Sequence, residues 1–313
     1  MFVEFFFVLS GYVISYNYFT LIKTKELRTY LIKRFSRLYP LLFYSTVILL
    51  FLEIIMNTFF VRFLNTPESI NSLLYQTLDT LTFMNSTPIF GSGLGMNYPS
   101  WSISSEMISY IMFGFLTIFT RKEKSHRYYL TLILLSILIL INKKLFFGID
   151  ISFVRGILSF SIGVLIHKFP FKSLNIPNYL DFLVPLLIIG TMFLINRTSG
   201  SYNTIHSVIT LNIVFYLSIH ILLKTKGIIT RILDSISFQF LGKISYSIYL
   251  NHVLLISIIP RGVFDLLGIE KTTISMISVL IMTILVLTIY SNFTFHYIEK
   301  FCGKYLNSHL LKS

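Results

Sequence analysis

The sequence predicts an all-α polytopic transmembrane helix bundle, because apolar residues dominate, charged residues are scarce, and the apolar residues fall in runs of membrane-spanning length. Hydrophobic residues make up 54% of the 313 residues and charged residues 12%, roughly half the charged share of an average soluble domain. One globular core of this size cannot bury so much apolar surface. Lipid is therefore the expected solvent.

About nine spans are expected, since a helix needs about 20 apolar residues to cross a bilayer. They cover residues 3–22, 38–60, 101–119, 128–142, 153–167, 181–195, 204–223, 244–260 and 273–297. No internal repeat and no low-complexity tract divides the chain. We therefore expect residues 1–313 to form a single integral membrane domain.

Lysine and arginine are concentrated in alternate connections between these spans. One set of connections holds 19 of them, the opposite set holds 6, and Arg155 lies inside a span. The richer set is 23–37, 120–127, 168–180, 224–243 and the tail after 297. By the positive-inside rule this set is cytoplasmic, which gives an external N-terminus and a cytoplasmic C-terminus. An external start so close to a span predicts a further helix upstream that this sequence lacks.

Composition also excludes several classes of site. The net charge of +13 would suggest nucleic acid in a soluble protein, but here the charges lie between apolar runs and indicate topology instead. The single cysteine, Cys302, excludes an intrachain disulfide and any cysteine-rich metal site. No nucleic-acid partner and no metal are expected.

The largest external connection, 61–100, contains two local features. Leu and Ile recur at helical spacing from about Ile70 to Phe83, which predicts a helix lying along the membrane interface. Residues 91–95 read GSGLG, and we interpret them as a flexible turn because no strand precedes them.

Ionisable groups at membrane depth are expensive, so each is a functional hypothesis, with a structural hydrogen bond between helices as the alternative. On one side of the span 101–119, helical spacing places Ser102, Glu106, Ser109 and Tyr110 together. The Glu106 carboxylate could orient a hydroxyl substrate, act as a base, or pair with an arginine.

The span 244–260 carries Ser245, Tyr249 and His252 at i, i+4 and i+7, which predicts a polar stripe facing the bundle. Imidazole can shuttle protons near neutrality, although a structural histidine fits the spacing equally well. Asn292, His296 and Glu299 repeat this spacing near the cytoplasmic end of the last span, where a solvated pair of His296 and Glu299 is expected.

Two groups of arginines also have a chemical and a structural interpretation. Arg155 inside a span needs a carboxylate or phosphate partner, and Glu53 is a candidate counter-charge. Arg34 and Arg37 lie at i, i+3 next to the membrane. Spacing alone allows them to anchor the helix at anionic lipid or to clamp the phosphates of a cytoplasmic cofactor.

Six segments in order make this chain resemble the acyltransferase-3 family of bacterial membrane O-acyltransferases, from about residue 2 to 301. The segments are FFFVLSGYVI (5–14), RFSRLYP (34–40), WSISSE (101–106), RGILSFSIG (155–163), SYSIYLNH (245–252) and YIEK (297–300).

This resemblance implies ten helices with both termini cytoplasmic, in the cytoplasmic (inner) membrane of a bacterium. It implies transfer of an acyl group from acetyl-CoA or another acyl-CoA to a hydroxyl of a cell-surface or lipid-linked glycan, such as exopolysaccharide, lipopolysaccharide O-antigen or peptidoglycan. Arg34 and Arg37 would bind the CoA, while Glu106, Arg155, Tyr249 and His252 would line the catalytic cavity. The family's first helix carries the histidine assigned as catalytic base, and no residue before Phe5 supplies it here.

Two alternatives remain open at this point. One is a transporter of glycan or lipid-linked intermediates, which buried polar stripes also fit. The other is a catalytically inactive remnant of the family. The acceptor sugar, the acyl group and the oligomeric state are not encoded in any motif that we recognise.

Overall fold

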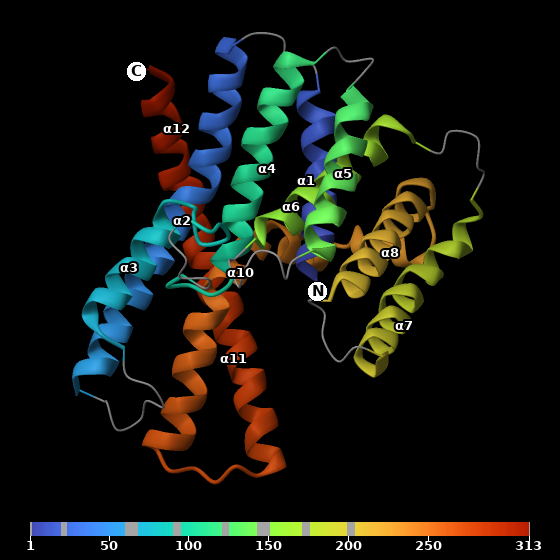
Figure 1. The fold of residues 1–313 in the computed structure, drawn as a ribbon. Coiled ribbons are helices and arrows are strands. Elements are labelled where there is room, and N and C mark those ends of the chain that lie inside the picture. Colours follow the sequence, from blue (N-terminus) through green and yellow to red (C-terminus); the bar gives the residue numbers. More distant parts are fainter. Residues whose placement is uncertain are drawn as a thin grey trace. The chain divides into compact units, whose positions relative to one another are not determined.

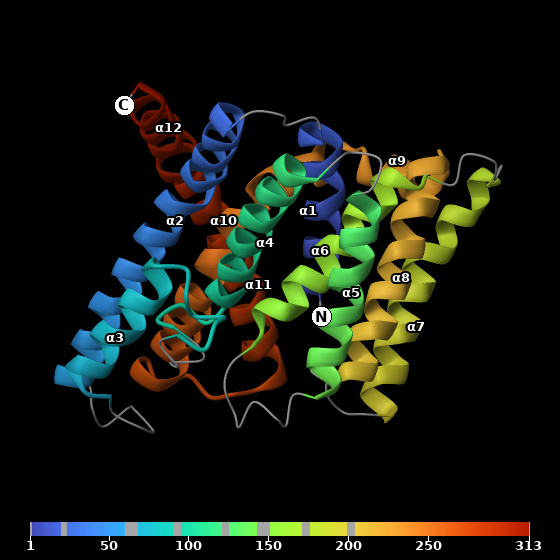
Figure 2. The same ribbon diagram turned by 45° about the horizontal axis from the view of Figure 1, so that its top comes forward.

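The computed structural model describes residues 2–19, 24–59, 68–89, 95–120, 125–142, 151–170, 176–198 and 204–312. These residues form helices and short connections (Figures 1 and 2). The chain separates into two compact units, which we describe one at a time. The first comprises Met1–Leu31 and Ser105–Gln239, and the second Ile32–Ser104 and Phe240–Ser313.

The helices follow the predicted spans closely. Those of the first unit are α1 (Phe2–Tyr18), most of α4 (Ser100–Phe119), α5 (Ser125–Ile141), α6 (Phe153–Lys168), η3 (Asn178–Phe182), α7 (Leu183–Thr198), α8 (Ile205–Lys224) and α9 (Ile228–Leu233). Those of the second are most of α2 (Thr24–Phe59), α3 (Ile70–Leu81), most of α10 (Ile236–Arg261), η4 (Gly262–Leu266), α11 (Thr273–Thr294), η5 (Phe295–Cys302) and α12 (Gly303–Lys312). Within the described residues, each of the nine predicted spans overlaps a different α-helix.

The protein is a multi-pass membrane protein by helix length and hydropathy. Within the described ranges, six helical segments are long and apolar enough to cross a bilayer, and α5 is a shorter apolar helix. The segment containing α11 is the most apolar of them, and most of its large side chains are exposed. A helix that is apolar all round and exposed is suited to contact with lipid.

Two helices extend further than the sequence analysis predicted. The expected span 38–60 is the second half of α2, a 36-residue helix that begins at Thr24 and contains Pro40. The expected span 244–260 is the end of α10, which begins at Ile236. Charged residues exclude both extensions from the membrane core but not from a helix, which is why hydropathy missed them.

In the first unit, α1 crosses α6 at two glycines (Figure 1). A Cβ added to Gly11 would overlap the backbone carbonyl of Phe160, and one added to Gly163 would overlap that of Val8. Small residues let membrane helices approach closely and gain van der Waals contact. A core lies beside this crossing, where Val8 and Phe215 are fully buried.

In the second unit, α3 lies along α2 in both views (Figures 1 and 2). Leu73 of α3 packs in one cluster with Leu49 of α2 and Leu254 of α10. The predicted interfacial helix is therefore confirmed as a helix, and Ser69 caps it by accepting a hydrogen bond from the Ser72 backbone N–H. Of the predicted turn at 91–95, only Gly95 lies within the described residues, with a φ of 64° that favours glycine.

Candidate functional site

Glu106 lies in the middle of a buried hydroxyl network in the first unit. It is 2% exposed, and its Oε1 accepts a hydrogen bond from Ser10 Oγ at 3.0 Å. Tyr110, one turn along α4, donates its hydroxyl to the same oxygen, and its own oxygen lies 2.9 Å from Ser10 Oγ. The predicted meeting of Glu106 and Tyr110 is confirmed. This arrangement holds a carboxylate in one orientation, which suits either a base or a structural anchor.

Arg155 pairs with Glu4, a residue that the sequence analysis did not single out. Arg155 Nη2 of α6 donates to Glu4 Oε1 of α1, and the Glu4 side chain is fully buried while that of Arg155 is 13% exposed. The proposed counter-charge, Glu53, belongs to the second unit. A signal for Glu4 was present, because it is the only ionisable carboxylate in the predicted span 3–22.

These two polar groups occupy neighbouring turns of adjacent helices. A Cβ added to Gly156 would lie 2.8 Å from the Ser105 Cβ, so α4 and α6 approach closely there. Ser105 precedes Glu106, and Gly156 follows Arg155. The structure thus brings Glu106 and Arg155 into one region of the first unit.

Tyr249 and His252 lie in the second unit, on α10. The Tyr249 hydroxyl donates to the Pro99 carbonyl at 3.1 Å and lies 2.9 Å from Ser102 Oγ. His252 is half-buried, and its Nδ1 lies 2.6 Å from the Tyr249 carbonyl oxygen. The backbone contact orients the imidazole and leaves Nε2 as its other polar atom.

The predicted stripe on α10 is wrong at its first member. Ser245 is exposed and donates to the Gly242 carbonyl of its own helix. The buried polar residues here are Ser247 and Asn251. Ser247 donates a hydrogen bond to Glu299 Oε2 at 2.8 Å, and Asn251 donates one to Thr294 Oγ1 at 2.8 Å. The helix face was therefore misjudged, because contacts with η5 and α11 decide which side is buried.

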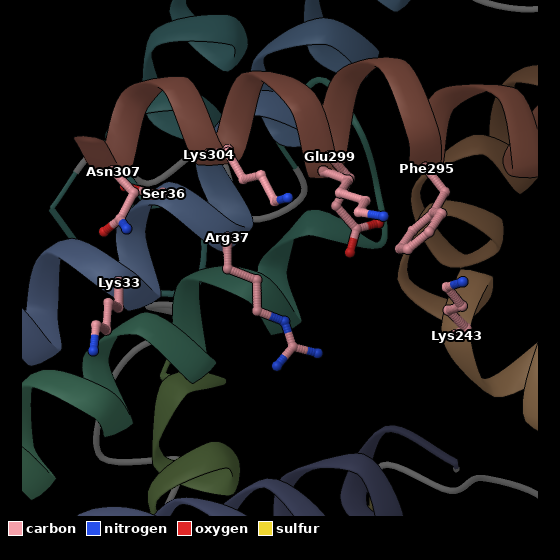
Figure 3. Close-up of a pocket in the computed structure, with 10 residues that line it drawn as sticks. Lys33, Ser36, Arg37, Lys243, Phe295, Glu299, Lys304 and Asn307 are labelled. Atoms are coloured by element: carbon pink, nitrogen blue, oxygen red, sulfur yellow. The ribbon is translucent and has the colours of Figure 1, made fainter. Parts of the chain in front are cut away.

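A cavity of about 400 Å³ opens in the second unit where α2, α10 and the C-terminal helices meet (Figure 3). Among its described lining residues, five are cationic and one is a carboxylate, Glu299. The cationic ones are Lys33, Arg37, Lys243, Lys300 and Lys304. Since ligand pockets usually measure about 300–1,000 Å³, this cavity is large enough for a small anionic group.

Of the two arginines predicted to bind CoA, only Arg37 is among the described lining residues of this cavity. Arg37 lines it, whereas Arg34 is half-buried and is not among its described lining residues. Glu299 also differs from the expected solvated pair with His296. Its carboxylate faces the cavity and accepts the Ser247 hydroxyl, while the Nδ1 of exposed His296 lies 2.8 Å from the Asn292 carbonyl oxygen.

Residues 1–292 match the acyltransferase domain of a known protein family. The chain belongs to the acyltransferase-3 family. It matches no curated protein and no solved structure. The match covers most of the chain, which supports an acyltransferase enzyme and disfavours the transporter alternative.

Proposed function

We propose that this acyltransferase moves an acyl group, such as acetyl, from an acyl-CoA to a hydroxyl of a cell-surface glycan or lipid-linked glycan. The enzyme would work in the cytoplasmic membrane of a bacterium. The observation that carries the donor assignment is the cation-rich cavity at Arg37. CoA bears a pyrophosphate and a ribose phosphate, and guanidinium and ammonium groups are the side chains that bind phosphate best.

The cavity also lies where the distribution of charge would place a cytoplasmic substrate. Lys33 and Arg37 come from the connection 23–37, Lys243 from 224–243 and Lys304 from the tail, all assigned to the cytoplasmic side by the positive-inside rule. Three segments that are distant in sequence thus contribute to one cavity in the second unit. Acyl-CoA is made in the cytoplasm, so this face suits the donor.

In the proposed reaction, the glycan hydroxyl oxygen attacks the thioester carbonyl, the carbon–sulfur bond breaks, and CoA leaves as its thiol. A base must take the hydroxyl proton and return it to the sulfur. We assign Glu106 and His252 as the candidate groups, since the Glu106 carboxylate and the free edge of the His252 ring can each accept a proton. Tyr249 would position the start of α4 through the contacts of its hydroxyl with Pro99 and Ser102. Arg155 would position Glu4 and α1 beside Glu106.

The test uses membranes containing the protein, radiolabelled acetyl-CoA, and the glycan fraction of the expressing bacterium as acceptor. Arg37→Ala should lower label transfer at least tenfold, since a charged hydrogen bond contributes about 1.5–3 kcal/mol. Arg37→Lys should restore part of it, because lysine keeps the charge without the bidentate fork. Arg231→Ala, which removes an exposed arginine of α9, is the matched control. Equal transfer by Arg37→Ala and the unchanged protein would refute the donor assignment, and no transfer from acetyl-, propionyl- or succinyl-CoA would refute the function.

A further inference from the structure

The wall of the cavity is built largely by residues that follow the family match. That match ends at residue 292, yet six of the ten described lining residues belong to η5 and α12. They are Phe295, Glu299, Lys300, Gly303, Lys304 and Asn307. The C-terminal segment Phe295–Lys312 therefore belongs to the cavity as much as α2 does.

A close backbone contact holds this segment against α2. Pro40 has no N–H, so the carbonyl of Ser36 lacks its usual helical partner four residues on. Gly303, the first residue of α12, lies over that carbonyl, and a Cβ there would be 2.8 Å from the Ser36 oxygen. Both residues are buried and line the cavity. A side chain at position 303 would push α12 away from α2, so glycine fixes where the segment sits.

Further contacts fix the segment from the side of α10. Ser247 Oγ donates to Glu299 Oε2 at 2.8 Å, and Lys243 Nζ lies 5.5 Å from the centre of the Phe295 ring. Phe295 and Glu299 belong to η5, which is π-helical, and π-helical turns often occur at functional sites. The C-terminal segment therefore contacts α2 through Gly303 and α10 through Glu299 and Phe295. Its residues Glu299, Lys300 and Lys304 line the cavity.

The charges of this cavity are unbalanced. Figure 3 shows Lys33 and Arg37 on α2, Lys304 and Glu299 on the C-terminal helices, and Lys243 on α10, around one opening. Like charges gathered in a partly enclosed space repel one another, and a bound anion relieves that repulsion. Glu299 offsets only part of the charge and is itself engaged by Ser247.

We propose that the segment Phe295–Lys312 completes a phosphate-binding site, in which Lys304 of α12 binds together with Lys33 and Arg37 of α2. This inference rests on the proposed function, in which the phosphates are those of the acyl-CoA donor. The volume of about 400 Å³ suits the phosphate-bearing end of that donor better than the whole molecule. A phosphate ester of an anionic lipid headgroup carries the same chemistry and is the alternative source.

The experiment measures CoA binding to the purified chain in neutral detergent by isothermal titration calorimetry, which needs no turnover. Lys304→Ala should weaken CoA binding about tenfold, and Lys304→Arg should restore it. Lys312→Ala is the matched control, because it removes the same charge from the same helix outside the cavity. Lys304 is exposed, so its truncation leaves the fold unchanged.

Each outcome decides one question. Weaker binding by Lys304→Ala with normal binding by Lys312→Ala supports the site with CoA as its ligand. If both variants bind CoA as the unchanged chain does, the inference is overturned while the proposed donor stands.

If the unchanged chain does not bind CoA, the proposed donor is wrong, and short-chain phosphatidylglycerol is titrated instead, with phosphatidylcholine as the neutral lipid. Binding that Lys304→Ala weakens then keeps the phosphate site with a lipid ligand. Binding that Lys304→Ala leaves unchanged, or no binding, overturns it.

Discussion

The ion pair between Glu4 and Arg155 offers a direct test of how the first unit is held together. Both side chains are removed from solvent, with 0% and 13% exposure, so water screens their charges little. Removing one partner of a buried pair leaves an uncompensated charge and costs about 3–5 kcal/mol. Replacing both by neutral groups of similar size is often nearly neutral, because the desolvation cost of both ions disappears as well.

The single variants Glu4→Gln and Arg155→Met should each lower the free energy of unfolding by about 3–5 kcal/mol. The double variant should be more stable than either single variant, because neither buried charge is then left without its partner. Reversible unfolding in mixed detergent micelles, followed by the loss of the helical circular dichroism signal, measures all four proteins.

A double variant no more stable than the weaker single variant would refute the pairing as a source of stability. The same four proteins also separate the two roles considered for Arg155. If the double variant folds and still transfers label from acetyl-CoA, Arg155 is a structural residue. If it folds and transfers none, the guanidinium contributes to the reaction beyond holding Glu4 in place.

Other predictions concern the packing and the hydroxyl network of the same unit. Gly163→Ala should destabilise the protein by about 1–3 kcal/mol, because the added Cβ would overlap the Val8 carbonyl. Gly190→Ala should be neutral or stabilising by up to about 1 kcal/mol, because a Cβ there meets no atom within 4 Å. Equal melting temperatures for the two alanine variants would contradict the helix crossing. Tyr110→Phe should lower stability by about 1.5–3 kcal/mol, since it removes a hydroxyl that donates to the Glu106 carboxylate. An unchanged melting temperature in a thermal-shift assay would show that this hydrogen bond contributes nothing.

Hydropathy predicted the helices well, because a bilayer imposes one length and one polarity on every span. It failed where a helix leaves the membrane. Lys33, Arg34 and Arg37 look like a polar connection in a hydropathy profile, although they continue α2 without a break. The same limit hid the helical form of the C-terminal residues Gly303–Lys312, which are too polar to register as a span.

The candidate site was predictable only where its parts lie on one helix. Glu106 and Tyr110 are one turn apart, so helical spacing alone placed them together. The other parts of the site come from segments that are distant in the sequence. Ser10 donates a hydrogen bond to Glu106, and Lys304 lines the same cavity as Arg37. A single sequence carries no measure of such contacts.

The structure also changes what the family motifs mean for activity. Gly11 and Gly163, which belong to two of the six motifs, are required by the crossing of α1 and α6, where any side chain would meet backbone. A protein that had lost catalysis would still need both glycines to fold, so the two glycines are explained by the fold and not by the reaction. Arg37 is different, because it is exposed and lines a cavity that also holds four lysines, where like charges repel one another. Whether this chain is an enzyme or an inactive remnant is therefore tested at Arg37 and not at the two glycines.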